Sequence, residues 1–411
     1  MTKYALVDAA NLFYRARHVV RGDAFTKAGM ALHIVFRSLR KLYREQNCDH
    51  VVLCLEGKSW RFDVYPEYKA RRKLDRLNMK PQEKEEDEVF LATLEDFAQY
   101  MAEKTRCTVL QSQGVEGDDF IARWIQLHPN DEHVILSGDS DFIQLLADNV
   151  SIYNGVDNRL ITHEGVFDGD SGKALMFSVD TSSGKLKVPG ITVDDAKKKH
   201  DKEQKEKEKA HLAREKDRKP YFEQEEKNKN LSDPTYEIKP FVAEPYRWVD
   251  FDPGVEPNWW QKALFIKCIR GDTGDGIFSA YPGVRYEGSK GKNAKPSIRE
   301  AWEDRNDKGF NYNNFMLQSW DKLKGVDADG NNITEKVRVI DEFKFNESLI
   351  DLTAQPQHVK DLMDSVIVQA VQKEPVGNVG VHFLQFCHRN QLNNLAREAT
   401  DHATYLNSGY K

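Results

Sequence analysis

Short acidic clusters recur along this chain, and their residue types suit metal chemistry. The stretch 114–124 reads GVEGDDFIARW and has three carboxylates at the start of an amphipathic helix. Capping alone would explain this one cluster, because acidic residues in a first turn complement the helix dipole. Further acids lie in SGDSD and RGDTGDG and at the ends of two apolar runs. The candidate carboxylates are Asp8, Glu56, Glu116, Asp118, Asp119, Asp139, Asp141, Asp272 and Asp275.

Carboxylates gathered in one crevice repel one another unless cations neutralise them or their pKa values rise. Oxygen ligands without His or Cys select a hard divalent ion, Mg²⁺ or Mn²⁺. Two such ions roughly 4 Å apart can hold a hydroxide nucleophile and stabilise the leaving oxygen of a phosphodiester. The acidic residues therefore predict nuclease chemistry with two Mg²⁺ or Mn²⁺ ions per active site.

A basic stretch follows Glu56 directly and reads GKSWRFDVYPEYKARRK over residues 57–73. Cations interleaved with aromatic rings are typical of a surface that neutralises phosphates and stacks bases. An ordinary basic helix with long side-chain stems is the alternative. The position next to Glu56 favours nucleic-acid binding, and Arg15, two helical turns after Asp8, is expected near the same crevice. The candidates in the stretch are Lys58, Arg61, Tyr68, Lys69, Arg71 and Arg72.

These residues need a scaffold, and the apolar pattern predicts an α/β fold. Short β-branched runs at 3–8, 50–55 and 133–141 alternate with helical patterns at 30–45 and 89–104. Such alternation predicts a mostly parallel sheet flanked by helices. Ligands bind such sheets at the carboxyl ends of the strands, where these acids lie.

The middle of the chain changes character. Residues 174–188 predict a β-hairpin, and 191–240 is almost all charge without an apolar stripe, which predicts a solvated helix or a partly disordered insertion. A nucleic-acid arm or a partner contact is the minority alternative for this insertion. Helical sequence resumes near Trp259, and no internal repeat is apparent. We expect a nuclease core at 1–165, a hairpin and charged insertion at 166–250, and a helical region at 251–411.

The overall composition limits the class of protein and the cell compartment that we expect. The chain has 411 residues, a net charge of −6, 39% hydrophobic residues and five scattered cysteines. No apolar run approaches the roughly 20 residues of a membrane helix, and no signal peptide is apparent. These features predict a cytoplasmic protein without a membrane partner and with reduced cysteines, in the host cytoplasm if a phage encodes the chain.

Six motifs together resemble the flap endonuclease superfamily of 5′ nucleases, especially the primer-removal (RNase H type) nucleases of tailed bacteriophages. The motifs are VDAANLFYR, LCLEGKSWR, YPEYKARRK, GVEGDDF, SGDSDFIQLL and RGDTGDG, in the family's order. They cover residues 1–165 and about 255–285. FNESLIDL, at 345–352, is similar to the segment where the family's chain returns to its core.

The resemblance implies roles for individual residues. The first metal ion would be held by Asp8, Glu56, Glu116, Asp118 and Asp139, with Asp119 in support, and the second by Asp141, Asp272 and Asp275. Lys69 and Arg72 would be catalytic by steering the scissile phosphate. Tyr68 would stack on a terminal base, and Arg15 would contact phosphate.

Two positions depart from the family pattern. Glu56 stands where many members have Asp, and the helix-hairpin-helix loop keeps PGV at 282–284 and then diverges. Gly283, Lys290 and Lys292 would still present N–H groups and cations to a duplex phosphate.

The leading hypothesis is a 5′-3′ exonuclease and flap endonuclease that removes RNA primers or 5′ flaps during DNA replication. Its partners would be DNA and RNA/DNA duplexes with a 5′ end or flap, together with a single-strand-binding protein or a sliding clamp. A PIN-type ribonuclease is the enzyme alternative, and a non-catalytic DNA-structure-binding protein is the alternative from another class.

Overall fold

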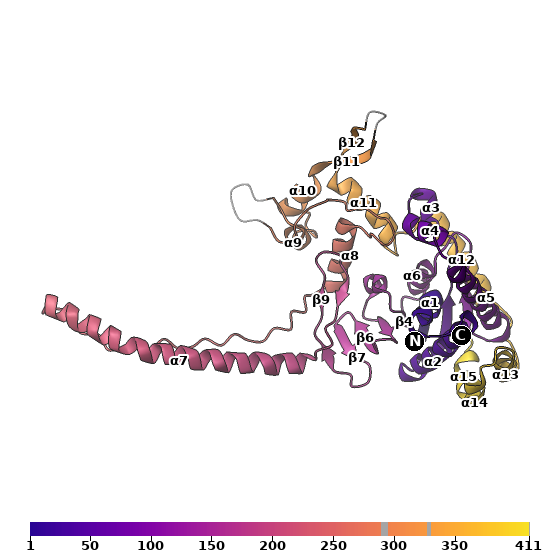
Figure 1. Ribbon diagram of the computed structural model, residues 1–411, viewed down its shortest axis with the longest axis horizontal. Coiled ribbons are helices and arrows are strands. Elements are labelled where there is room, and N and C mark those ends of the chain that lie inside the picture. The colour runs from indigo at the N-terminus through magenta and orange to yellow at the C-terminus, as the bar shows by residue number, and fades with distance from the viewer. Residues whose placement is uncertain (289–294, 327–329, 411) are drawn as a thin grey trace.

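The computed structural model describes residues 1–288, 295–326 and 330–410 (Figure 1). Its centre is an eight-stranded sheet in the order β3-β2-β1-β4-β5-β6-β7-β8. Strands β3, β2, β1, β4 and β5 are parallel, and β6 to β8 continue antiparallel. The expected mostly parallel α/β fold is confirmed. The strands are β1 (Lys3–Asp8), β2 (His50–Cys54), β3 (Thr108–Leu110), β4 (Glu132–Leu136), β5 (Val150–Asn154), β6 (Arg159–Thr162), β7 (Gly165–Asp168) and β8 (Ala174–Leu175).

The register of the central strands decides which side chains meet. Strand β1 is apolar and buried along almost its whole length, and it lies between β2 and β4. Asp8 is paired with Cys54, and Val7 with Leu136. The residues that follow β1, β2 and β4 therefore leave the sheet at the same carboxyl edge.

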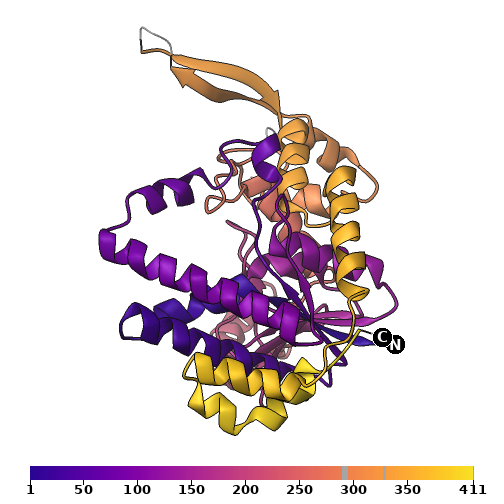
Figure 2. The same ribbon diagram turned by 90° about the vertical axis from the view of Figure 1, so that its right-hand side faces the viewer.

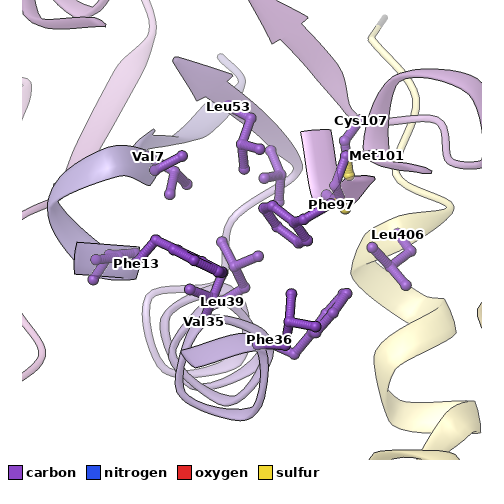
Figure 3. Close-up of a cluster of buried hydrophobic side chains, with 14 of the residues drawn as sticks. Val7, Phe13, Val35, Phe36, Leu39, Leu53, Phe97, Met101, Cys107 and Leu406 are labelled. Carbon is purple, nitrogen blue, oxygen red and sulfur yellow. The ribbon is translucent and has the colours of Figure 1, made fainter. Parts of the chain in front are cut away.

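Helices from both ends of the chain cover one face of the sheet. They are α1 (Ala9–Val19), α2 (Ala24–Glu45), α5 (Pro81–Lys104), α13 (Val379–Arg389), α14 (Asn393–Arg397) and α15 (Ala399–Leu406). Phe36, Phe97 and Leu406 lie in their shared core (Figure 3). The last helices thus pack on the N-terminal core because their apolar faces complete it, so the expected 251–411 region is not one separate helical unit.

The opposite face and the region beside the sheet form two further cores. The opposite face is covered by α6 (Gly117–Leu127), the 3₁₀ helix η1 (Ser140–Leu145), α8 (Trp259–Arg270) and α12 (Gln357–Val371). Beside it, Phe265, Phe315 and Phe343 unite α8 with α3 (Arg61–Val64), α9 (Ile298–Glu303), α10 (Phe310–Met316) and α11 (Val339–Ile350). The mainly helical C-terminal region was expected. Its hairpin was not expected. This hairpin consists of β11 (Ser319–Val326) and β12 (Asn332–Arg338) and projects from the body in Figure 2.

The charged insertion is a long projecting helix. A short hairpin of β9 (Ser178–Val179) and β10 (Leu186–Lys187) confirms the expected hairpin. Helix α7 (Val193–Ser232) then runs away from the body, and residues 233–258 return beside it (Figure 1). Thr192 caps the helix by accepting the Asp195 N–H at 3.1 Å. Of the two alternatives for this segment, the structure has the solvated helix. No helix in the described parts of the chain combines the length and apolarity needed to cross a bilayer.

Candidate active site

A cleft of about 680 Å³ lies at the carboxyl edge of the central strands. Eight of the nine candidate carboxylates line it, although they come from separate segments of the chain. They are Asp8, Glu56, Glu116, Asp118, Asp139, Asp141, Asp272 and Asp275. The ends of β1, β2 and β4, the first turn of α6 and the loop after α8 bring them together.

Close backbone packing holds the loops that carry these acids. A side chain at Gly57, next to Glu56, would place its Cβ 1.9 Å from the Ser112 carbonyl oxygen. A Cβ at Gly138, next to Asp139, would lie 1.9 Å from a guanidinium nitrogen of Arg15. Arg15 thus lies against the loop of the cleft, as the sequence predicts, although it is not among the lining residues.

Asp119 does not face the cleft, so the expectation that it is a metal ligand is wrong. It is fully buried, and both its oxygens are used by protein donors. Arg61 donates to it through two nitrogens at 3.0 Å, and the Trp60 indole donates at 3.1 Å. Its carboxylate instead holds Arg61 and Trp60 in the wall of the cleft, which agrees with the expectation that Asp119 supports the metal ligands.

Arg61 and Tyr68 were expected to contact nucleic acid, and the structure contradicts both assignments. Arg61 is 2% exposed and also donates to Glu116 at 2.8 Å and to the Leu349 carbonyl at 2.7 Å. Tyr68 is 3% exposed, and its ring packs on Phe62, so no base reaches it. Both side chains build the wall of the cleft because its buried carboxylates need donors.

Lys69 links the two sides of the cleft at the start of α4 (Ala70–Leu77). Its backbone is left-handed (φ 52°), and its N–H donates to the Asp275 carbonyl at 2.8 Å. Its ammonium forms an ion pair with Glu116. Arg72, one turn later, donates to Asp275 at 2.7 Å. The two residues expected to be catalytic therefore lie in the cleft next to the acids.

The loop GDTGDG positions Asp272 and Asp275 after α8. Gly271 has φ 76°, and a Cβ there would lie 2.3 Å from the Ile277 carbonyl oxygen. Asp272 accepts the Gly274 N–H at 2.8 Å. Asp275 is turned towards the start of α4, where the Tyr68 hydroxyl donates to it at 3.2 Å.

Lys267 is a site residue that sequence reasoning missed. Its ammonium lies between Asp141 and Asp272, at 2.6 and 2.8 Å. It is 6% exposed on the buried face of α8. The available signal was a lysine inside the apolar run ALFIKCI, because a buried lysine is rare unless it is paired.

Four cleft carboxylates have no ion pair among the described residues, and we call them the unpaired set: Asp8, Glu56, Asp118 and Asp139. Enclosure by the walls of the cleft and the neighbouring acids raise the pKa of all four, although the Glu56 side chain is still exposed to solvent. The pKa of Asp8 rises to about 6 and that of Glu56 to about 7. The unpaired set therefore holds negative charge that no protein cation compensates at short range.

The other four carboxylates, the paired set, each have a protein cation: Glu116, Asp141, Asp272 and Asp275. Burial disfavours the charged form of Glu116, but Lys69 and Arg61 lower its pKa below the usual value. Lys267 likewise lowers the pKa of Asp272 against the effect of burial. Burial still raises the pKa of Asp275, despite Lys69 and Arg72.

The remaining candidates lie farther out. Lys58 and Arg71 are exposed beyond the lining of the cleft, and Gly283 is exposed with φ 71°. Lys290 and Lys292 lie outside the described residues. The lining includes further cations that were not singled out as site residues, namely Lys73, Arg76 and Lys185.

The donor chemistry of the cleft fits a hard divalent cation. No group of three or more His, Cys, Asp or Glu side chains within the described ranges is already arranged as a metal cage. The unpaired set nevertheless supplies four carboxylates with raised pKa values and solvent access through the cleft. Carboxylates in this state are stabilised by an added cation.

The N-terminal part of the chain matches a known protein family. The model of the 5′-3′ exonuclease N-terminal resolvase-like domain matches residues 3–169. This part of the chain is therefore similar to the N-terminal domain of 5′-3′ exonucleases. The match spans the strands that carry Asp8, Glu56 and Asp139.

Individual relatives are distant. The chain is 26% identical over 198 residues to the flap endonuclease Xni of Shewanella loihica, covering 46% of this chain and 72% of that protein. It is 28% identical over 189 residues to a 5′-3′ exonuclease of Bacillus subtilis, covering 42% of this chain and 60% of that protein. A solved complex of the bacteriophage T5 flap endonuclease with DNA and metal ions has a TM-score of 0.47 at 16% identity, over 90% of this chain and 100% of that chain.

Proposed function

We propose that this chain is a divalent-metal-dependent 5′-3′ exonuclease and flap endonuclease, which hydrolyses phosphodiesters near the 5′ ends of DNA or RNA strands. One observation carries the proposal. Eight carboxylates line one cleft, and the basic helix α4 lies at its mouth. The matched family region and the two curated relatives support the same activity.

The unpaired set, with Glu116 beside it, would hold one Mg²⁺ or Mn²⁺ ion. Asp141, Asp272 and Asp275 would hold or surround a second one. Such ions supply a hydroxide nucleophile at neutral pH and stabilise the leaving oxygen. Because Lys267 already neutralises Asp141 and Asp272, we expect the second site to bind its ion more weakly.

The chain's own residues position the substrate. Lys69 and Arg72 place two cations on the cleft side of α4, where a scissile phosphate would lie between them and the carboxylates. Arg61, Trp60 and Asp119 keep Glu116 in place through buried hydrogen bonds. Arg15, Lys58 and Arg71 are the proposed outer contacts to the phosphate backbone, and Gly283, Lys290 and Lys292 those to the duplex.

The proposed biological role is in DNA replication. Removal of RNA primers or 5′ flaps during replication, in a bacteriophage or its host, fits the motif pattern of the phage nucleases. A single-strand-binding protein or a sliding clamp would then be a partner. We expect this enzyme to act in the cytoplasm, where replication takes place in such cells.

Cleavage of a 5′-labelled duplex with a 5′ flap, and of an RNA-primed DNA duplex, tests the function. Each substrate is incubated with Mg²⁺ or with EDTA, and wild type is compared with Asp139→Asn. We expect metal-dependent release of short 5′ products that the substitution abolishes. Tight binding without cleavage would instead support the DNA-structure-binding protein. Cleavage of single-stranded RNA alone would support the PIN-type ribonuclease.

A further inference from the structure

The projecting arm, formed by α7 and the return segment 233–258, contains an internal repeat that the sequence analysis missed. On α7, His200, His211 and Phe222 are eleven residues apart. Their ring partners on the return segment, Phe251, Tyr246 and Phe241, are five residues apart, at centroid distances of 5.7, 5.7 and 5.6 Å. Each eleven-residue step on the helix therefore pairs with five residues of extended chain.

Hydrogen bonds repeat with the same two periods. The side chains of Gln204, Glu215 and Glu226 are buried against the return segment. They accept the backbone N–H groups of Val249, Glu244 and Lys239 at 3.5, 3.0 and 3.0 Å. Eleven helical residues rise about 16 Å, and five extended residues span about the same length, so the two periods stay in register. The return segment thereby fixes one face of α7 against itself.

A different side of the helix, about 130° round from the face that binds the return segment, carries a stripe of lysines. Helix α7 has thirteen basic and eleven acidic residues and is nearly neutral overall. Six exposed lysines nevertheless fall within a sector of about 60°, at about 100° per residue. This lysine stripe consists of Lys198, Lys202, Lys205, Lys209, Lys216 and Lys227. Lys205, Lys216 and Lys227 follow the eleven-residue period themselves.

Most of the stripe is not neutralised by the protein. Lys198 has an ion pair with Asp195 at 3.5 Å, and Glu223 in the same sector pairs with Lys219 at 3.8 Å. The other five stripe lysines have no ion pair among the described residues. Their ammonium groups therefore form a basic surface roughly 38 Å long, the length of about 11 base pairs at ~3.4 Å each.

The arm begins close to the cleft. The hairpin β9-β10 contributes Lys185 to the cleft lining, and α7 starts six residues after β10. A nucleic acid held in the cleft thus lies against the hairpin that leads into the arm. A row of exposed cations along one side of a helix suits a phosphate backbone, which neutralises cations without any sequence requirement.

We propose that the lysine stripe of α7 is a second, sequence-independent contact for the phosphate backbone of the nucleic acid, outside the cleft. The class of partner rests on the proposed nuclease function. The return segment orients the stripe by binding another face of the helix and leaving the stripe exposed. Loss of the stripe then weakens binding of long substrates without changing the chemistry of cleavage.

Two double variants with the same charge change test the inference. Lys205→Glu/Lys216→Glu alters the stripe. Lys207→Glu/Arg214→Glu is the control, because each of its residues is two positions from a stripe residue and points about 200° away. All four side chains are exposed, and circular dichroism checks that both variants keep their helix content.

Fluorescence anisotropy in EDTA measures binding to flapped duplex and to single-stranded DNA across a salt series. Each lost phosphate contact lowers the slope of log affinity against log salt by about one, so the stripe variant should lose about two and the control none. The form of DNA that shows the loss is the one that the stripe contacts. Equal slopes for the two variants would overturn the inference and leave an acidic protein as the partner that the stripe fits.

Cleavage of a short flap substrate in Mg²⁺ separates this inference from the proposed function. We expect wild-type rates for both variants on a duplex too short to reach the arm. Absence of cleavage by every variant, together with the slope difference, would overturn the nuclease and keep the arm. Normal cleavage without any slope difference would overturn the arm alone.

Discussion

The unpaired and paired carboxylate sets line one cleft but differ in how their charge is compensated. Asp8, Glu56, Asp118 and Asp139 have no ion pair among the described residues, and their pKa values are raised. In the paired set, Lys69, Arg72 and Lys267 are among the protein cations within ion-pair distance. The same residue type is thus kept in two electrostatic states by its neighbours. The number of carboxylates in a cleft therefore does not show where a metal ion binds, because their charge compensation by protein cations differs.

The unpaired set is where an added divalent cation would gain most. Four carboxylates held close together destabilise the folded chain when they are charged. Binding of a divalent cation would explain why the cleft contains four unpaired carboxylates despite this cost in stability. Protein cations already compensate much of the charge of the paired set, so its role depends more on positioning Lys69 and Arg72 towards the substrate.

The largest effect is expected for Asp118→Asn. Loss of one proposed ligand should lower kcat at least about 10³-fold, since metal stabilisation of the transition state is worth several kcal/mol. The metal-free variant should also be more stable than wild type, because a buried charge is removed. Flap cleavage and chemical denaturation in EDTA measure the two effects. Asp217→Asn on α7 is the control, and equal activity of both variants would contradict the metal role.

Arg61→Met tests whether Arg61 is a buried structural partner of Glu116 and Asp119 and not a nucleic-acid contact. Removing the guanidinium leaves Asp119 buried without its main partner, so we expect a loss of about 3–5 kcal/mol in the free energy of unfolding. Lys58→Met, three residues earlier and exposed, should change stability by less than about 0.5 kcal/mol. Urea denaturation compares them. Weakened DNA binding by a fully stable Arg61→Met would restore the original nucleic-acid role.

Lys267→Met should leave Asp141 and Asp272 without a protein cation, as the unpaired carboxylates are. Asp141 and Asp272 lose their shared cation, so unfolding free energy in EDTA should fall by about 3 kcal/mol. Mg²⁺ should recover more stability in this variant than in wild type. Lys262→Met is a control on the same helix, because its partner Glu256 is 58% exposed. Thermal unfolding with and without Mg²⁺ provides the comparison, and an identical Mg²⁺ response in both variants would show that Asp141 and Asp272 bind no ion.

The pH dependence of metal-free stability is the mildest test. The folded pKa values of Asp8 and Glu56, about 6 and about 7, exceed their unfolded values. Folding then binds protons, so stability should fall as pH rises from about 4 to about 7 and level off above. For Asp8 alone, a shift of about two pKa units corresponds to at most about 3 kcal/mol. Urea denaturation in EDTA from pH 5 to 8 should show this fall, which Mg²⁺ should reduce. A stability that rises over this range would contradict the raised pKa values.

Much of the cleft was predictable because its acids lie within a few residues of strand ends. Asp8, Glu56 and Asp139 follow short apolar runs, and parallel strands bring such positions to one edge. The sheet was predictable for the same reason. The hairpin β11-β12 was missed because its strands are mostly polar and an irregularity between Leu323 and Gly325 interrupts the alternation.

The misassigned residues depend on packing that no local pattern contains. Arg61 and Tyr68 lie in a basic, aromatic stretch, and composition does not separate an exposed cation from one buried against Asp119. Lys267 becomes a site residue only because α8 packs beside η1. The repeat in the arm was hidden because its two halves have different periods, eleven and five residues, and different residue types.

Calorimetric titration of Mg²⁺ into the wild type and Asp118→Asn at pH 8 measures whether the unpaired set binds the ion. We expect that wild type binds Mg²⁺ and is stabilised by it, whereas Asp118→Asn, although more stable without metal, loses this binding. Equal Mg²⁺ affinity in the two proteins would contradict the claim that the unpaired carboxylates form the metal site.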